Sequence, residues 1–164
     1  MRRILLIPIM VVMLFSTVVD AQDGETRTVI RDEAAAKRLV GKHKLSLQWI
    51  SWNYFGSASV TNKKCRSYAN EHAVGGLCYW LKGEQKGRAN SDYLKIDGII
   101  LSVDTREFVF QGTVETQISH INGGKPCSRM GDFTFKVTGK RKYWRLMQMD
   151  NPCDQATDYV DIYF

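Results

Sequence analysis

Short runs of alternating apolar and polar residues, separated by only a few turn residues, fill the sequence from Gly41 to its end. Residues 106–118 and 159–164 are two of these runs. Alternation with a period of two places every second side chain on one face of a β-strand. Links this short join antiparallel neighbours, because parallel strands need a crossover of a dozen residues or more. The pattern therefore predicts an all-β domain of eight or nine short antiparallel strands.

A meander of this kind exposes the backbone of its two edge strands unless the sheet closes on itself. We therefore expect a small up-and-down β-barrel in a single domain, residues 32–164. A short helix opens this domain, because Asp32 can cap residues 33–40, which are rich in alanine, and Gly41 can end them. The polar residues 22–31 are expected to form a flexible N-terminal segment.

Residues 1–21 have the layout of a secretory signal peptide. Two arginines precede an apolar run, Ile4–Val19, and the small residue Ala21 stands before the polar Gln22. An uncleaved membrane anchor is the alternative, but the run is shorter than the roughly 20 residues that span a bilayer. We expect a mature chain that begins at Gln22 and is secreted or periplasmic.

The formal net charge of +6 is mild, and its cations are scattered among many acids. This distribution is typical of a solvated surface. Weak attraction to anionic lipid, glycan or nucleic acid is the sharper interpretation. Because export separates a protein from most nucleic acid, we expect no nucleic-acid partner.

The best-defined hairpin lies between residues 132 and 147. Thr138-Gly139-Lys140-Arg141 fits a two-residue loop with glycine first, as a type II′ turn prefers. The apolar residues of its two strands then share one face, which supports the register. That register sets three pairs opposite each other: Val137 with Lys142, Phe135 with Trp144, and Phe133 with Leu146.

Four cysteines in an exported chain indicate disulfides, and three pairings are possible. Extending the hairpin outward brings Cys127 and Cys153 to nearly the same level, where a bridge would staple its open end. The other bridge, Cys65–Cys78, would close a polar loop at residues 63–76. Cysteine-bound zinc is the competing interpretation, and the absence of C-x-x-C spacing disfavours it.

Residues 93–103 allow two interpretations. Asp97-Gly98 between alternating residues is a hairpin signal, yet it also fits a bulge in one long, bent strand. In either case a hairpin loop follows at residues 104–107, and its register aligns Leu101 with Phe110 and Ile99 with Gly112. The remaining expectations are strands at residues 45–54 (with a bulge near Trp49-Ile50), 57–61 and 77–82, and loops at residues 83–91 and 119–131.

The helix and first strand, Leu39–Leu45, resemble the entry to lipocalin-like (calycin) barrels. Those barrels commonly carry Gly-x-Trp there, with the tryptophan plugging the closed end. Here Gly41 is present, and His43 stands where the tryptophan would be. The resemblance implies an up-and-down barrel with an apolar interior able to hold a small ligand. It carries over no ligand-binding residue.

Aromatic side chains are the candidate ligand-binding residues. Trp52 and Tyr54 have the strand parity opposite to Leu45 and Leu47, so they could line a cavity mouth, and Trp144 is a third candidate.

Nothing in the sequence carries a catalytic signature. His43, His72 and His120 lack ligand or triad spacing, and there is no Gly-x-Ser-x-Gly elbow. The acidic residues from Asp150 to Asp161 match no calcium-loop spacing, which favours an exposed turn. We therefore expect a protein that is not an enzyme and that holds neither a cofactor nor a metal.

These observations predict an exported, monomeric binding protein that holds a small apolar ligand inside a disulfide-stapled barrel. The alternative is a protein-partner or inhibitor module that acts through loops 65–78 and 119–131. An outer-membrane barrel is a third interpretation, because the last strand alternates and ends in the aromatic Phe164. Several expected strands are shorter than the roughly 9–11 residues that such a barrel needs.

Overall fold

The computed structural model describes residues 27–66 and 73–164. The expected signal peptide, His72 and the tip of the 65–78 loop lie outside the described residues. The described elements are β1 (Val29–Ile30), α1 (Glu33–Leu39), β2 (Gly41–Leu47), β3 (Gly56–Arg66), β4 (Ala73–Lys86), β5 (Tyr93–Val103), β6 (Glu107–Gln117), η1 (Asn122–Gly124), β7 (Cys127–Lys136), β8 (Tyr143–Leu146) and β9 (Val160–Tyr163).

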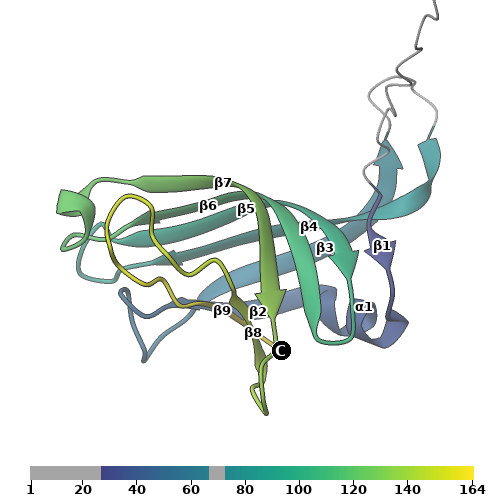
Figure 1. The fold of residues 1–164 in the computed structure, drawn as a ribbon, viewed down its shortest axis with the longest axis horizontal. Coiled ribbons are helices and arrows are strands. Elements are labelled where there is room, and N and C mark those ends of the chain that lie inside the picture. Colours follow the sequence, from purple (N-terminus) through teal and green to yellow (C-terminus); the bar gives the residue numbers. More distant parts are fainter. Residues whose placement is uncertain (1–26, 67–72) are drawn as a thin grey trace, which may run out of the picture.

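The strands β2 to β9 form a closed antiparallel barrel in which each strand pairs with its neighbours in sequence. The circle closes where β9 returns to β2, with Leu45 opposite Ile162. β1 lies outside this circle and runs parallel to the end of β5. The predicted up-and-down barrel of eight or nine strands is therefore confirmed, with eight strands in the circle, and Figure 1 shows these strands wrapping around one axis.

The barrel interior is filled by side chains. Phe108 stacks on Phe135 with ring centroids 5.0 Å apart, and Phe110 meets the edge of Phe135 at 6.2 Å. These three rings are fully buried, together with leucines and isoleucines from most strands. The outward positions carry exposed ion pairs instead, such as Lys82–Asp97 at 3.2 Å. This alternation is the reverse of the apolar outer band of a membrane-spanning barrel.

Helix α1 forms where the sequence predicts it. The Asp32 carboxylate accepts a hydrogen bond from the Ala35 amide at 2.8 Å, which satisfies one of the free N–H groups of the first turn. The helix ends at Leu39, and Gly41 follows in the left-handed region with φ of 125°. The buried face of α1 (Ala35, Ala36, Leu39) packs on the hydrophobic core.

The expected strand over residues 45–54 is wrong beyond Leu47. No bulge occurs at Trp49-Ile50, because the chain leaves the sheet there: the amides of Ile50 and Ser51 both donate to the Leu47 carbonyl. The change of apolar phase marks the end of a strand. Residues 48–55 form a connection, and Trp49 packs against the core from it.

Strands β3 and β4 are longer than predicted. Part of each expected loop, at 63–76 and at 83–91, belongs to them. The loop at residues 83–91 was predicted because glycine and polar residues are common in loops. Gly83 and Gln85 instead face inward from β4. A side chain at Gly83 would press on Leu45 and Ala58, and the buried Gln85 accepts a hydrogen bond from the Leu47 amide at 2.7 Å.

Residues 93–103 form one continuous strand, so the hairpin interpretation of Asp97-Gly98 is wrong. Gly98 lies opposite Gly112, and a Cβ on either glycine would come within 2.7 Å of the Phe110 ring. The glycines therefore provide space for this ring. The irregularity occurs at Leu101 instead, and it aligns Ile100 rather than Leu101 with Phe110.

The β7–β8 hairpin keeps the predicted face with a different register. Phe135 lies opposite Leu146 rather than Trp144, a shift of two residues that leaves the same side chains inside. The turn at Thr138–Arg141 is present, but Val137 bonds back to Arg106 on the β6 side, so the connection is longer. In addition, β7 begins at Cys127, within the expected 119–131 loop.

Both expected disulfides are present. Cys65–Cys78 joins β3 to β4, and Cys127–Cys153 ties the start of β7 to the loop between β8 and β9. The second bridge holds residues 147–159, a long connection without a strand of its own, against the barrel.

Candidate functional site

The two ends of the barrel differ in composition. The helical end comprises α1, the turns at residues 104–106 and 137–142, and Phe164. The loop end comprises the connections at residues 48–55, 87–92, 118–126 and 147–159. In Figure 1, α1 lies on the right, the marked C-terminus lies near the lower centre, and the loop end lies on the left.

A buried ion pair closes the loop end. Arg129 points inward from β7, and its guanidinium lies 3.2 Å from the carboxylate of Asp158. The same carboxylate accepts hydrogen bonds from the Trp49 indole and the Asn151 amide, both at 3.2 Å. The other guanidinium nitrogen donates to two backbone carbonyls of the 147–159 loop. These contacts attach two connections, 48–55 and 147–159, to strand β7.

Burial governs the ionisation of this pair. It raises the pKa of the Asp158 carboxyl, and the nearby Arg129 guanidinium opposes that rise. Burial also lowers the pKa of Arg129. A charge that is buried and fully engaged by protein groups is unavailable to a ligand, so we assign this network to the fold.

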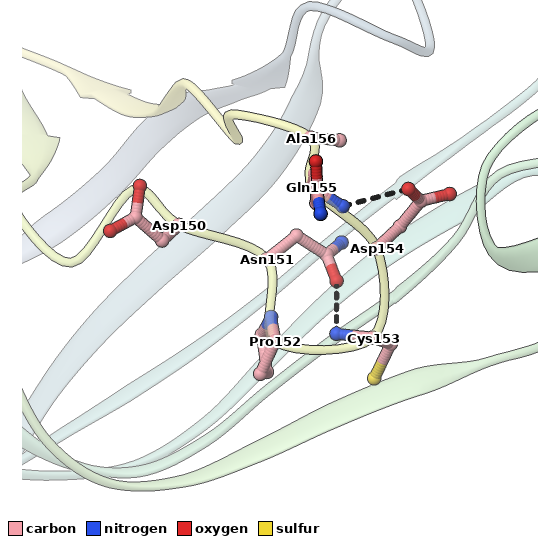
Figure 2. Close-up of a pocket in the computed structure, with 7 residues that line it drawn as sticks. All are labelled: Asp150, Asn151, Pro152, Cys153, Asp154, Gln155 and Ala156. Atoms are coloured by element: carbon pink, nitrogen blue, oxygen red, sulfur yellow. Dashed lines mark hydrogen bonds between the residues drawn. The ribbon is translucent and has the colours of Figure 1, made fainter.

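The turn at residues 150–156 is closed by its own hydrogen bonds. Asn151 accepts from the Cys153 amide at 3.0 Å, and Asp154 accepts from the Gln155 amide at 2.7 Å (Figure 2). The carboxylates of Asp150 and Asp154 point in different directions. No group of three or more potential His, Cys, Asp or Glu ligands occurs in the described part of the chain.

The helical end holds an open groove of about 550 Å³, which we call the basic groove. It lies over β2 and the end of β9, and Phe55, the last residue of the 48–55 connection, also lines it through its contact with Tyr163. Four cations and three aromatic rings are among its lining residues, whereas no carboxylate side chain is. These residues are Arg38, Val40, Lys42, His43, Lys44, Phe55, Lys142, Tyr163 and Phe164.

Strand alternation positions the groove residues of β2. Lys42 and Lys44 point outward and are exposed, and His43 between them points inward. Both ring nitrogens of His43 lie within hydrogen-bond distance of carbonyl oxygens: Leu39 at 2.8 Å and Tyr163 at 3.0 Å. His43 thereby joins the end of α1 to the end of β9 and fixes the inner wall of the groove.

Aromatic rings, rather than carboxylates, support two of the groove cations. The Arg38 guanidinium lies 5.1 Å from the centroid of the Phe164 ring, and the Lys44 ammonium lies 5.1 Å from that of Phe55. Within residues 27–66 and 73–164, none of the four groove cations takes part in an ion pair. Their positive charge therefore stays available to a ligand.

The structure does not bring the three candidate aromatics together. Trp52 is 63% exposed in the 48–55 connection. Tyr54 is held in the same connection, where its hydroxyl accepts from the Arg88 amide at 3.1 Å. Trp144 is buried at the helical end, 4.4 Å from the Phe164 ring. Trp144 thus contacts two groove residues, because its ring also lies 5.7 Å from that of His43.

Sequence reasoning missed the groove cations. Lys42 and Lys44 were available as a signal, because alternate lysines before an apolar strand indicate a charged outer face. Arg38 and Lys142 are too distant in sequence to be linked to that face without the fold. His120, one of the histidines considered for catalysis, lies at the loop end with its ring 5.8 Å from that of Trp49.

In the described residues, no helix is long and apolar enough to cross a membrane. The family model described as the PM1083 family matches residues 27–164. The chain is also 43% identical to an uncharacterised protein, PM1083, from Pasteurella multocida (strain Pm70), over 77% of this chain and 74% of that protein. No solved structure matches.

Proposed function

The chain belongs to the PM1083 family, and we propose that it is an exported binding protein that holds an anionic ligand in its basic groove. The observation that carries this proposal is a set of four cations that form no ion pair among the described residues. Arg38, Lys42, Lys44 and Lys142 line one hollow without a carboxylate side chain among its lining residues. Some cations elsewhere on the barrel, such as Lys82 and Lys86, do have an acidic partner within 4 Å.

Collecting like charges costs folding free energy, so an unpaired cluster indicates a function in binding. The two rings beneath Arg38 and Lys44 add to this arrangement. A cation held over a ring keeps its charge, and its position is fixed before a ligand arrives. The groove is thus preorganised for oxyanions such as phosphate or carboxylate groups.

An apolar ligand in the barrel interior, as the lipocalin-like resemblance implies, remains a prediction. The packing favours the groove over the interior, because Phe108, Phe110 and Phe135 fill the lumen with ring-to-ring contacts. A barrel of eight strands has room for its own side chains or for one small ligand.

A protein partner bound through loops 65–78 and 119–131 also remains a prediction. The tip of the first loop lies outside the described residues. The second is tied to the neighbouring connections, because the Ser119 amide donates to Asp92 and the Asn122 amide donates to Asp154, both at 2.8 Å. Export is supported by the two disulfides, which fit an oxidising compartment.

Calorimetric titration with inorganic tripolyphosphate tests the proposal. The protein is recovered from a secretory host, with its N-terminus defined by mass spectrometry. We expect binding that weakens as salt rises from 50 to 500 mM, because screening shortens the range of the groove charges. The double variant Lys42→Glu/Lys142→Glu should weaken binding about tenfold or more.

The matched control is Arg88→Glu/Lys125→Glu, two exposed cations of the loop end that change the net charge equally. It should leave the affinity within about twofold. An equal loss in both double variants would mean that net charge alone attracts the anion, and the groove would be rejected as the site.

A further inference from the structure

The positive charge of the helical end extends beyond the groove. Four more exposed cations surround it, and among the described residues none of the four has an acidic partner within 4 Å. They come from three separate segments: Lys37 on α1, Arg106 in the first turn, and Lys140 and Arg141 in the second.

Hydrogen bonds link these segments to one another. Arg38 reaches the Thr105 carbonyl at 3.5 Å, and Arg106 donates to the carbonyls of Val137 and Gly139. The Phe164 amide donates to the Lys142 carbonyl at 3.3 Å. The groove cations and the four additional cations therefore come from linked segments at the same end of the barrel, and we call this set of eight cations the basic end.

The carboxylates of the basic end are few and partly engaged. Asp32 uses both oxygens, one on the Ala35 amide and one on the Thr105 hydroxyl. Asp104 accepts from the Thr105 amide, and Glu107 pairs with Lys136 at 2.6 Å. Glu33 is exposed on α1. The eight cations outnumber these four carboxylates, so the basic end carries a net positive charge.

An anion confined to the groove would leave Lys37 and Lys140 unused. A partner that meets the whole basic end must be extended and carry many negative charges. Single-stranded nucleic acids are usually held by stacking of their bases on free aromatic faces. Here Arg38 and Lys44 already lie over the exposed rings of Phe164 and Phe55, and Arg141 lies 5.6 Å from the Tyr143 ring.

Binding to a bilayer surface does not require free aromatic faces. Its phosphate groups attract clustered cations, and apolar side chains such as phenylalanine that lie beside cations can enter the headgroup boundary. Phe55 and Phe164, each 40% exposed, lie among the cations. We propose that the basic end docks on a bilayer rich in anionic phospholipid, with one headgroup phosphate in the groove; this rests on the proposed function.

Co-sedimentation with vesicles tests the docking. Large vesicles of phosphatidylcholine with about 30% phosphatidylglycerol are compared with vesicles of phosphatidylcholine alone. We expect at least a tenfold preference for the anionic vesicles at 50 mM salt and its loss at 500 mM. Strong binding to the neutral vesicles would overturn the proposal.

Three matched double variants locate the contact. Lys42→Glu/Lys142→Glu should lose both vesicle and tripolyphosphate binding. Lys37→Glu/Lys140→Glu, outside the groove lining, should lose vesicle binding about tenfold yet keep tripolyphosphate within twofold. Arg88→Glu/Lys125→Glu should keep both. Thermal unfolding curves verify that every variant is folded.

The outcomes separate the two proposals. Tripolyphosphate binding without vesicle binding would overturn the docking and leave the groove intact. Absence of both would overturn the proposed function as well. Tighter binding to a soluble polyanion such as heparin than to anionic vesicles, at equal charge concentration, would also overturn docking on lipid.

Discussion

The two ends of this barrel use charge in opposite ways. At the loop end, Arg129 and Asp158 are 8% and 1% exposed in their side chains and satisfy each other. At the helical end, Arg38, Lys42 and Lys142 are exposed and have no ion-pair partner within 4 Å among the described residues. Charge that is consumed within the molecule maintains the fold, whereas charge left open is available to a partner.

The covalent and polar links follow the same division. The Cys127–Cys153 bridge and the Arg129–Asp158 pair both fasten the long 147–159 connection, which has little regular structure. The helical end relies on a helix cap and on His43. We therefore expect stability to be most sensitive to changes at the loop end and binding to changes at the helical end.

The largest effect should come from Asp158→Ala. It leaves the buried Arg129 guanidinium without a counter-charge, which typically costs about 3–5 kcal/mol of unfolding free energy. Urea unfolding measures the loss. The exposed Asp154→Ala on the same connection is the control and should cost far less. Equal losses would show that the connection, and not the ion pair, determines stability.

Next in size is Cys127→Ser, expected to lower the unfolding free energy by about 3 kcal/mol because it releases the loop constraint on the unfolded chain. Its partner thiol, Cys153, should then react with a maleimide. Peptide mapping identifies the labelled residue. Labelling of Cys65 or Cys78 instead would contradict the pairing.

Asp32→Asn should change the acid limb of the stability profile. The Ala35 amide, and then the Thr105 hydroxyl, lower the pKa of Asp32 below its ordinary 3.8. A lowered folded pKa gives stability that is present above 3.8 and is lost as the pH falls below it. Asparagine also caps helices but does not titrate, so melting temperatures from pH 7 to pH 2 should fall less steeply. If the melting temperatures of the variant and the parent fall equally at low pH, Asp32 does not contribute to the pH dependence of stability.

The smallest effect on stability is expected from Lys142→Glu. This variant tests most directly whether charge at the helical end serves binding rather than the fold. Relieving repulsion at the helical end should raise the melting temperature by about 1 °C at low salt, with no gain at high salt. The same change should weaken tripolyphosphate binding. A loss of stability instead would mean that Lys142 serves the fold.

Sequence patterns predicted more of the fold than of the candidate site. The α1 cap, the apolar face of the β7–β8 hairpin and both cysteine pairs were predictable, because each depends on neighbours in sequence or on alternation. The length of β4 was not, because Gly83 and Gln85 look like loop residues until Leu45 and the Leu47 amide lie beside them. The groove was missed because its cations come from segments that only the folded chain brings together.

By itself, the sequence determined that the chain forms a closed antiparallel sheet with one apolar face. A period of two and short links allow few other ways to bury that face and protect the strand edges. Only the tertiary structure decided the registers, the closure of β9 on β2 and the meeting of Arg38, Lys44 and Lys142. Those features depend on contacts between segments far apart in the chain, which local patterns do not encode.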